Sequence, residues 1–184
     1  MVDPTFFDAQ LNALVPSFAP NVLPIFLTDN VFEGTNGLIS NCCILGYHAS
    51  ESAPIVTAHT WIYAAYTRSG TFGGNAILDV QPLSHEVSEW INDPFVGTPV
   101  LGGINLIPPA ILPGQGGACI VNFETGDPLE APVVAFTQVT NGSVYHLQDE
   151  AFLSWFLHGP SFGVNGFYSF LGAFLTPSAL CGPG

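Results

Sequence analysis

Glycine and proline recur along the whole chain and limit its fold more than any other feature. The 184 residues include 20 glycines and 16 prolines, which interrupt helices and end strands. We therefore expect short strands and long Gly/Pro-rich loops, including an uncharged one over residues 95–117. A chain of this length that is 48% hydrophobic can bury one core, so residues 1–184 are expected to form a single α+β domain.

Apolar, β-branched and aromatic runs bounded by turn residues predict the strands. These runs are residues 21–28, 44–48, 60–66, 133–140 and 143–148. The run 21–28 is expected to pair near 60–66, and Asn141-Gly142 predicts a hairpin turn between the last two runs. Asn141-Gly142-Ser143 also fits an N-glycosylation acceptor.

One helix is predicted after a glycine loop at residues 70–75. It begins near Asp79, which suits the N-cap, carries Pro82 in its first turn and ends by Asp93, before Pro94. Its apolar face consists of Val80, Leu83, Val87 and Ile91, and its polar face of His85, Glu86, Glu89 and Asp93. One interpretation is an amphipathic helix whose polar face is solvated.

The crowding of ionisable residues on that polar face favours a second interpretation. Only 8% of the chain is charged, yet His85, Glu86 and Glu89 lie within five positions. His85 and Glu89 are four residues apart and share one face of a helix, as two ligands of one metal ion must. Glu86 lies where the glutamate of the His-Glu-x-x-His zinc proteases acts as general base. The pattern thus predicts a metal site in which glutamate replaces the second histidine.

Further ligands are expected from the turn Glu124-Thr125-Gly126-Asp127. Its two acids flank a glycine and would point together if the turn is tight, although Asp127 could equally form an Asx-type turn before Pro128. His48 is a candidate ligand or a partner of one. The remaining histidines are more typical of structural residues: His59, His146 and His158. One imidazole and several carboxylates make a hard site, so calcium or manganese could compete with zinc.

The charge of the chain excludes some partners. One Lys+Arg and 14 Asp+Glu give a net charge of −13, so nucleic acid and anionic lipid surfaces would be repelled. The only basic residue is Arg68. A chain with one tryptic site and few carboxylates to protonate suits an acidic, protease-rich exterior.

The cysteines also favour secretion. Cys42, Cys43, Cys119 and Cys181 predict two disulfides, and we expect each of the adjacent pair to bond to one of the other two. Residues 1–4 lack the features of a signal peptide, so we expect a mature chain with an added Met1. The alternative is a cytosolic protein with four free thiols.

Two C-terminal segments, residues 151–157 and 166–175, are strongly apolar and aromatic. His158-Gly159-Pro160 and Gly163 interrupt them too early for a membrane span. We expect these segments to form core. If exposed, they would offer a surface for self-association.

Four segments resemble, in their order, a known family. They are Cys43-Ile44-Leu45-Gly46-Tyr47-His48, Ser84-His85-Glu86-Val87-Ser88-Glu89 with Asp93-Pro94, Glu124-Thr125-Gly126-Asp127, and Tyr145-His146-Leu147-Gln148. They are similar to segments of bacterial secreted proteins with a His-Glu-x-x-Glu core, which are distantly similar to the plant phosphate-induced (EXORDIUM-like) proteins. The resemblance spans roughly residues 20 to 150.

This resemblance implies a zinc-dependent peptidase acting on a peptide or protein substrate. The implied fold is a zincin-like domain with a mixed sheet and a metal-site helix near residues 80–92. His85 and Glu89 would be ligands, Glu124 a further ligand, and Glu86 the base. Tyr145 or His146 is a candidate, from chain order, for stabilising the oxyanion.

Two other functions stay open. One is a non-catalytic, secreted structural or binding protein in which a metal, if any, only holds loops in place. The other is an acid-active glutamic peptidase of β-sandwich type that uses Glu124 and Gln138 without a metal.

Overall fold

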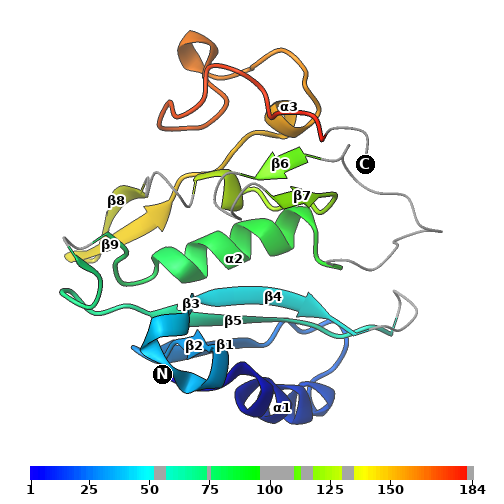
Figure 1. Cartoon of the computed structure of the whole chain (residues 1–184), viewed down its shortest axis with the longest axis vertical. Helices are drawn as coiled ribbons and strands as arrows, with labels where there is room; N and C mark the ends of the chain where they lie inside the picture. The colour runs from blue at the N-terminus through cyan, green and yellow to red at the C-terminus, as the bar shows by residue number, and fades with distance from the viewer. Residues whose placement is uncertain (52–56, 74–75, 96–109, 113–117, 130–134, 182–184) are drawn as a thin grey trace.

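The computed structural model describes residues 1–51, 57–73, 76–95, 110–112, 118–129 and 135–181. Within them the chain has the expected α+β architecture, with one small mixed sheet and few helices. Helix α2 (Gln81–Asn92) runs through the middle of the molecule, between two groups of strands (Figure 1). Most of the expected loop 95–117 and part of the glycine loop 70–75 lie outside the described residues.

A three-stranded sheet covers one side of α2. Its order is β1 (Ile25–Asp29), β5 (Thr60–Tyr66) and β4 (Gly46–Ser50). The predicted pairing of the two runs is confirmed: β1 pairs with β5, in the parallel direction, and β4 pairs antiparallel with β5. The first six residues of β5 are buried because β5 is the central strand and α2 packs against it. The expected strand 44–48 is split between β4 and β3 (Cys42–Ile44), which pairs with β2 (Glu33–Gly34).

The N-terminus forms a helix that the pattern of apolar residues did not predict. Helix α1 (Pro4–Leu14) has Asp3 as its N-cap, whose carboxylate accepts a hydrogen bond of 3.0 Å from the N–H of Thr5. Pro4 occupies the first turn, where it has no donor to leave unpaired. Short 3₁₀ turns follow at Val15–Ser17, Thr35–Gly37 and Ile39–Asn41.

The other side of α2 carries two antiparallel strand pairs. β6 (Ala110–Leu112) pairs with β7 (Ala118–Ile120), and β8 (Ala135–Thr140) pairs with β9 (Ser143–Gln148). The predicted hairpin turn is confirmed: Asn141 and Gly142 link Thr140 to Ser143 with φ values of 52° and 81°. Positive φ at both positions is what a two-residue turn of this kind needs, and Asn-Gly supplies it.

Helix α2 begins one residue later than expected, and its polar face is not solvated. Its N-cap is Val80, whereas the carboxylate of Asp79 accepts hydrogen bonds from the backbone N–H (2.8 Å) and Nδ1 (2.7 Å) of His146 on β9. Glu86 and Glu89 are 5% and 2% exposed, while Ile91, on the apolar face, is 67% exposed. The solvated interpretation is therefore wrong, because β4 and the turn at 124–127 cover the polar face.

The C-terminal segments form core only in part. After α3 (Leu153–Phe156), a short 3₁₀ turn follows at Val164–Gly166. The buried cluster consists of Phe123, Ala151, Trp155, Phe156 and Tyr168. Other apolar side chains of the segments stay exposed, with Phe170 at 70% and Leu175 at 66%. Among the described residues no helix is long and apolar enough to cross a membrane.

The disulfide pairing differs from the expected one. Cys119 bonds to Cys181 with an S–S distance of 2.01 Å and a Cα–Cα distance of 5.9 Å, and Cys42 bonds to Cys43. The expectation that the adjacent cysteines bond to the distant ones is wrong. β3, which carries Cys42 and Cys43, and β7, which carries Cys119, lie on opposite sides of α2 (Figure 1).

Candidate metal centre

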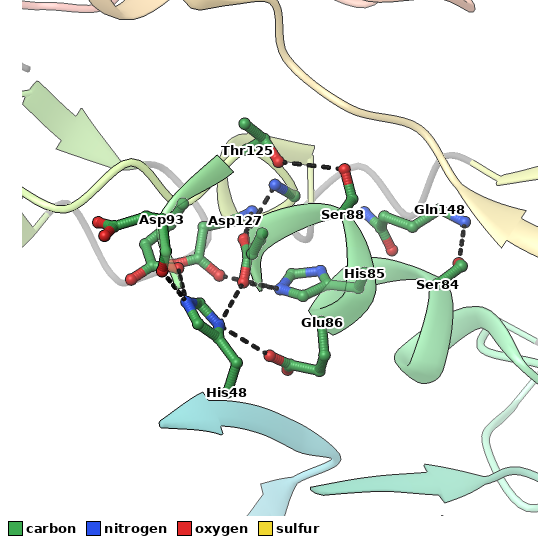
Figure 2. A network of polar contacts seen from close by, with 12 residues as sticks. His48, Ser84, His85, Glu86, Ser88, Asp93, Thr125, Asp127 and Gln148 are labelled. Atoms are coloured by element: carbon green, nitrogen blue, oxygen red, sulfur yellow. Dashed lines mark hydrogen bonds and ion pairs between the residues drawn. The ribbon is translucent and has the colours of Figure 1, made fainter. Parts of the chain in front are cut away.

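The buried face of α2 lines a cavity of about 400 Å³ between the helix, β4 and the turn at 124–127. Figure 2 shows side chains from these three elements pointing toward one another. The polar lining comprises two histidines, four carboxylates and two glutamines: His48, His85, Glu86, Glu89, Glu124, Asp127, Gln81 and Gln148. The structure therefore brings together the candidate base Glu86 and all four metal-ligand candidates of the helix and the turn: His85, Glu89, Glu124 and Asp127.

Three of these candidates have ligand atoms at metal-binding spacing. His85 Nε2 lies 3.1 Å from Glu89 Oε2 and 3.4 Å from Asp127 Oδ1. The three ligand atoms all lie within 4.8 Å of one another. Bonds of about 2.0–2.1 Å in a tetrahedral zinc site separate neighbouring ligand atoms by roughly 3.3 Å. The spacing in this triad, His85–Glu89–Asp127, is thus close to that of zinc ligands.

The turn at 124–127 orients Glu89. Glu89 Oε1 accepts hydrogen bonds from the backbone N–H groups of Gly126, at 2.9 Å, and Asp127, at 3.3 Å. This leaves Oε2 to face His85. Burial raises the pKa of Glu89, but His85, His48 and the Gly126 N–H outweigh burial and hold it below its ordinary value. Glu89 is therefore held as a carboxylate, the form that binds a cation.

A second group of ligand atoms shares Glu89. His48 on β4 lies with Nδ1 3.7 Å from Glu89 Oε2 and with Nε2 3.8 Å from Glu124 Oε2. One ligand atom from each of these three residues lies within 4.8 Å of the other two. The sequence could mark His48 only as a ligand or as a partner of one, because 37 positions separate it from His85. The fold places it in the cavity.

Glu86 is a buried carboxylate whose side chain faces the cavity. Its Oε2 lies 3.3 Å from His48 Nδ1. Burial raises its pKa above the ordinary value, and repulsion from Glu89 adds to this, while His48 and His85 oppose it. Gly46 lies against it: a β-carbon at position 46 would lie 2.7 Å from Glu86 Cγ and 2.8 Å from Oε1. A raised pKa suits a carboxylate that takes and returns a proton.

The crowding of acids is strongest at Glu124. Burial, with repulsion from Glu89 and Asp127, raises the pKa of Glu124 to about 10. Arg68, the only Lys or Arg of the chain, is paired with Asp29 at the surface. The sequence thus supplies the cavity with no lysine or arginine, and a cation from outside the chain would relieve the repulsion among its carboxylates.

Two other candidates do not reach the cavity. Tyr145 lies on β9 but is not among the described lining residues. It is three positions from Gln148, which does line the cavity, so the two side chains lie on opposite faces of the strand. Gln138 is exposed and donates a hydrogen bond to the backbone carbonyl of Val139, so it does not accompany Glu124. The expected structural histidines have partners outside the cavity: His59 with Glu51, His146 with Asp79, and His158 with Ser178.

Sequence reasoning missed Gln81, Gln148 and Glu150. Gln81 Nε2 donates to Gln148 Oε1 at 3.2 Å, and Gln148 Nε2 is buried without a hydrogen-bond partner among the described residues. Burial raises the pKa of Glu150 to about 8. No local pattern marks these residues, although Gln148 closes the last of the four segments that resemble the family.

Comparison with protein-family models, with curated proteins and with solved structures found no match for this chain. The geometry of the cavity is therefore the basis for assigning a function.

Proposed function

We propose that this protein is a metal-dependent peptidase in which His85, Glu89 and Asp127 hold a zinc ion and Glu86 is the general base. The observation that carries the proposal is the spacing of this triad, with edges of 3.1 and 3.4 Å, in the wall of a cavity that also contains Glu86. This grouping supports the metal-site interpretation of the His-Glu-x-x-Glu helix.

The donor set fits zinc, and manganese is the alternative because two of the three ligands are carboxylates. A cation bound there would supply Lewis acidity, which makes water more acidic and polarises a carbonyl group. The two backbone N–H groups that hold Glu89 Oε1 keep this ligand in place. Such supporting contacts are typical of metal sites.

Glu86 would move the proton. Its carboxylate takes a proton from water as the water oxygen bonds to the scissile carbonyl carbon, and it then returns that proton to the amine as the C–N bond breaks. The raised pKa of Glu86, due first to burial, makes it a stronger base than an exposed glutamate. Because residue 46 is a glycine, the side chain of Glu86 has room beside β4.

The amide of Gln148 is suited to a substrate carbonyl. Its Nε2 is a buried donor with no hydrogen-bond partner among the described residues. An unpaired buried donor is costly unless a bound group accepts from it, and a peptide carbonyl is such an acceptor. In this proposal Gln148 takes the role that chain order had suggested for Tyr145. With four carboxylates in the lining, acidic peptides are disfavoured.

We also propose that the protein works outside the cell in an acidic environment. The Cys119–Cys181 disulfide supports an oxidising compartment. The net charge of −13 with a single basic residue supports the acidic setting.

The test combines metal content with activity. We expect native protein, purified without a nickel column, to contain zinc and to cleave peptides, and His85→Ala to lose the zinc held by the triad and, with it, the activity. Glu86→Gln should keep the metal and lose turnover by several orders of magnitude. A fully active Glu86→Gln protein, or a wild-type protein that takes up no metal, would refute the proposal.

A non-catalytic role is the second candidate, and the exposed C-terminal side chains favour it. Phe162, Phe170 and Leu175 are 87%, 70% and 66% exposed, which would suit self-association. In that case the protein should show no peptidase activity, and chelation should change only its melting temperature. Sedimentation should show oligomers that dissociate in Phe162→Ser.

A further inference from the structure

The group formed by His48, Glu89 and Glu124 is not used by the proposed zinc site, apart from the shared Glu89. His48 is buried, and so are both carboxylates. Glu89 belongs to both groups, with His85 and Asp127 in one and His48 and Glu124 in the other. The question is what holds this second group together.

A backbone hydrogen bond orients the ring of His48. Its Nε2 lies 3.1 Å from the backbone carbonyl oxygen of Asp93. A carbonyl oxygen only accepts, so Nε2 carries a hydrogen. The other nitrogen, Nδ1, faces two carboxylate oxygens, Glu86 Oε2 at 3.3 Å and Glu89 Oε2 at 3.7 Å (Figure 2).

A proton on Nδ1 or a metal ion can lie between this nitrogen and the two carboxylates. An imidazole that donates one N–H to a backbone carbonyl and turns its other nitrogen toward carboxylates has the arrangement of a metal-bound histidine. Asp93 thus takes the part of the group that orients the ligand.

The number of carboxylates also leaves room for a second cation. Four carboxylates line the cavity, and imidazoles that bind metal are neutral. In their ionised forms all four would be balanced by two divalent ions, whereas one divalent ion would balance two of them.

We propose that a second divalent cation binds between His48, Glu89 and Glu124, so that Glu89 bridges two metal ions in a dinuclear centre. This inference rests on the proposed zinc site, because Glu89 belongs to both. Paired metal ions bridged by protein ligands are used in hydrolytic enzymes, where they hold both the attacking and the leaving group. Zinc and manganese are the cations that suit an imidazole with two carboxylates.

Counting bound ions tests the proposal. Metal-free protein is titrated with zinc by calorimetry, and bound metal is measured by plasma mass spectrometry after removal of free ion. We expect two ions per chain in the wild type, and one in Glu124→Gln, His48→Ala and His85→Ala. Glu51→Gln is the matched control, because Glu51 also pairs with a histidine, His59, at 2.7 Å but outside the cavity. It should retain two ions.

Manganese gives a readout that does not depend on counting. Two Mn²⁺ ions bridged by Glu89 are magnetically coupled, so the wild type should show a broadened paramagnetic resonance spectrum, and Glu124→Gln the six-line spectrum of an isolated ion. Glu124→Gln changes no side-chain volume, which keeps the comparison valid if His48→Ala fails to fold.

The outcomes separate the two proposals. One ion per saturated wild-type chain, lost in His85→Ala and kept in Glu124→Gln, would overturn the dinuclear centre and leave the proposed zinc site standing. No ion in the wild type would overturn both. Two ions in the wild type and in Glu124→Gln would also overturn the assignment of the second cation to these residues.

Discussion

Gly126 lies directly against the imidazole ring of His85. A β-carbon at position 126 would lie 2.7 Å from His85 Cε1 and 2.9 Å from Cγ, closer than carbon atoms can approach without displacement. The N–H of Gly126 also donates to Glu89 Oε1 at 2.9 Å. One glycine in the turn therefore positions both proposed ligands of the His-Glu-x-x-Glu helix.

Gly126→Ala should weaken metal binding because the added methyl group pushes the ring of His85 out of place. We expect a loss of roughly 10–100-fold in zinc affinity, the range found when supporting contacts of metal ligands are removed. Competition with a chromophoric chelator measures it. Gly73→Ala is the control, since a β-carbon there meets no atom within 4 Å. Equal affinities for the two variants would contradict the prediction.

Gly46→Ala should impair turnover while leaving zinc in place. A β-carbon at position 46 would lie 2.7 Å from Glu86 Cγ, so the side chain of Glu86 must move. None of the three atoms nearest to this β-carbon belongs to His85, Glu89 or Asp127. We expect a fall in kcat of about 10²-fold or more, the contribution of a positioned base. Metal analysis and steady-state kinetics on the same preparation would show it. If Gly46→Ala lost its zinc as well, the fall in kcat could not be assigned to displacement of Glu86, and the prediction would be wrong.

Stability should fall as the pH rises from about 4.5 to about 7, in part because of Glu33. This residue is fully buried, and burial together with Asp8 and Asp3 of the N-terminal region raises its pKa to about 7. The folded chain then holds a proton that the unfolded chain, with an ordinary glutamate pKa, releases earlier. The favourable contribution is complete below the unfolded pKa and is lost once the pH exceeds the folded one, at most about 3 kcal/mol.

Urea unfolding of the wild type and Glu33→Gln between pH 4 and pH 8 measures this dependence. Of the groups around Glu33, Asp3 and Asp8 come from the N-terminal region and α1, Tyr47 from β4 and Tyr63 from β5. The substitution leaves all four in place. The variant should therefore lose part of the pH slope, and an unchanged slope would exclude Glu33 as its source.

The Cys119–Cys181 disulfide should stabilise the fold far more than the Cys42–Cys43 pair. The two cysteines are 62 positions apart, and closing a loop of that length restricts the unfolded chain by about 4 kcal/mol. Adjacent cysteines close no comparable loop. Unfolding of Cys119→Ser/Cys181→Ser and Cys42→Ser/Cys43→Ser by urea compares them. Similar losses of unfolding free energy in both variants would show that loop closure is not what makes a disulfide stabilising here.

Local pattern was sufficient for several elements. The run 60–66 coincides with β5, and Asn141-Gly142 marks the turn of the β8–β9 hairpin, because alternation and turn residues act between neighbours in the chain. The α2 helix and the spacing of His85 and Glu89 were predictable for the same reason. The zincin-like form of the fold remains a prediction, as do the metal and the reaction.

Local pattern specified the α2 helix, with His85 and Glu89 one turn apart, and the acidic turn at 124–127. Tertiary packing determines that the polar face of α2 is the buried one, that His48 joins it from β4, and that Gln148 rather than Tyr145 lines the cavity. The disulfide pairing depends on packing too. A helix wheel separates two faces without specifying what covers either of them. That choice depends on residues distant in the chain, whose packing here encloses carboxylates and imidazoles together.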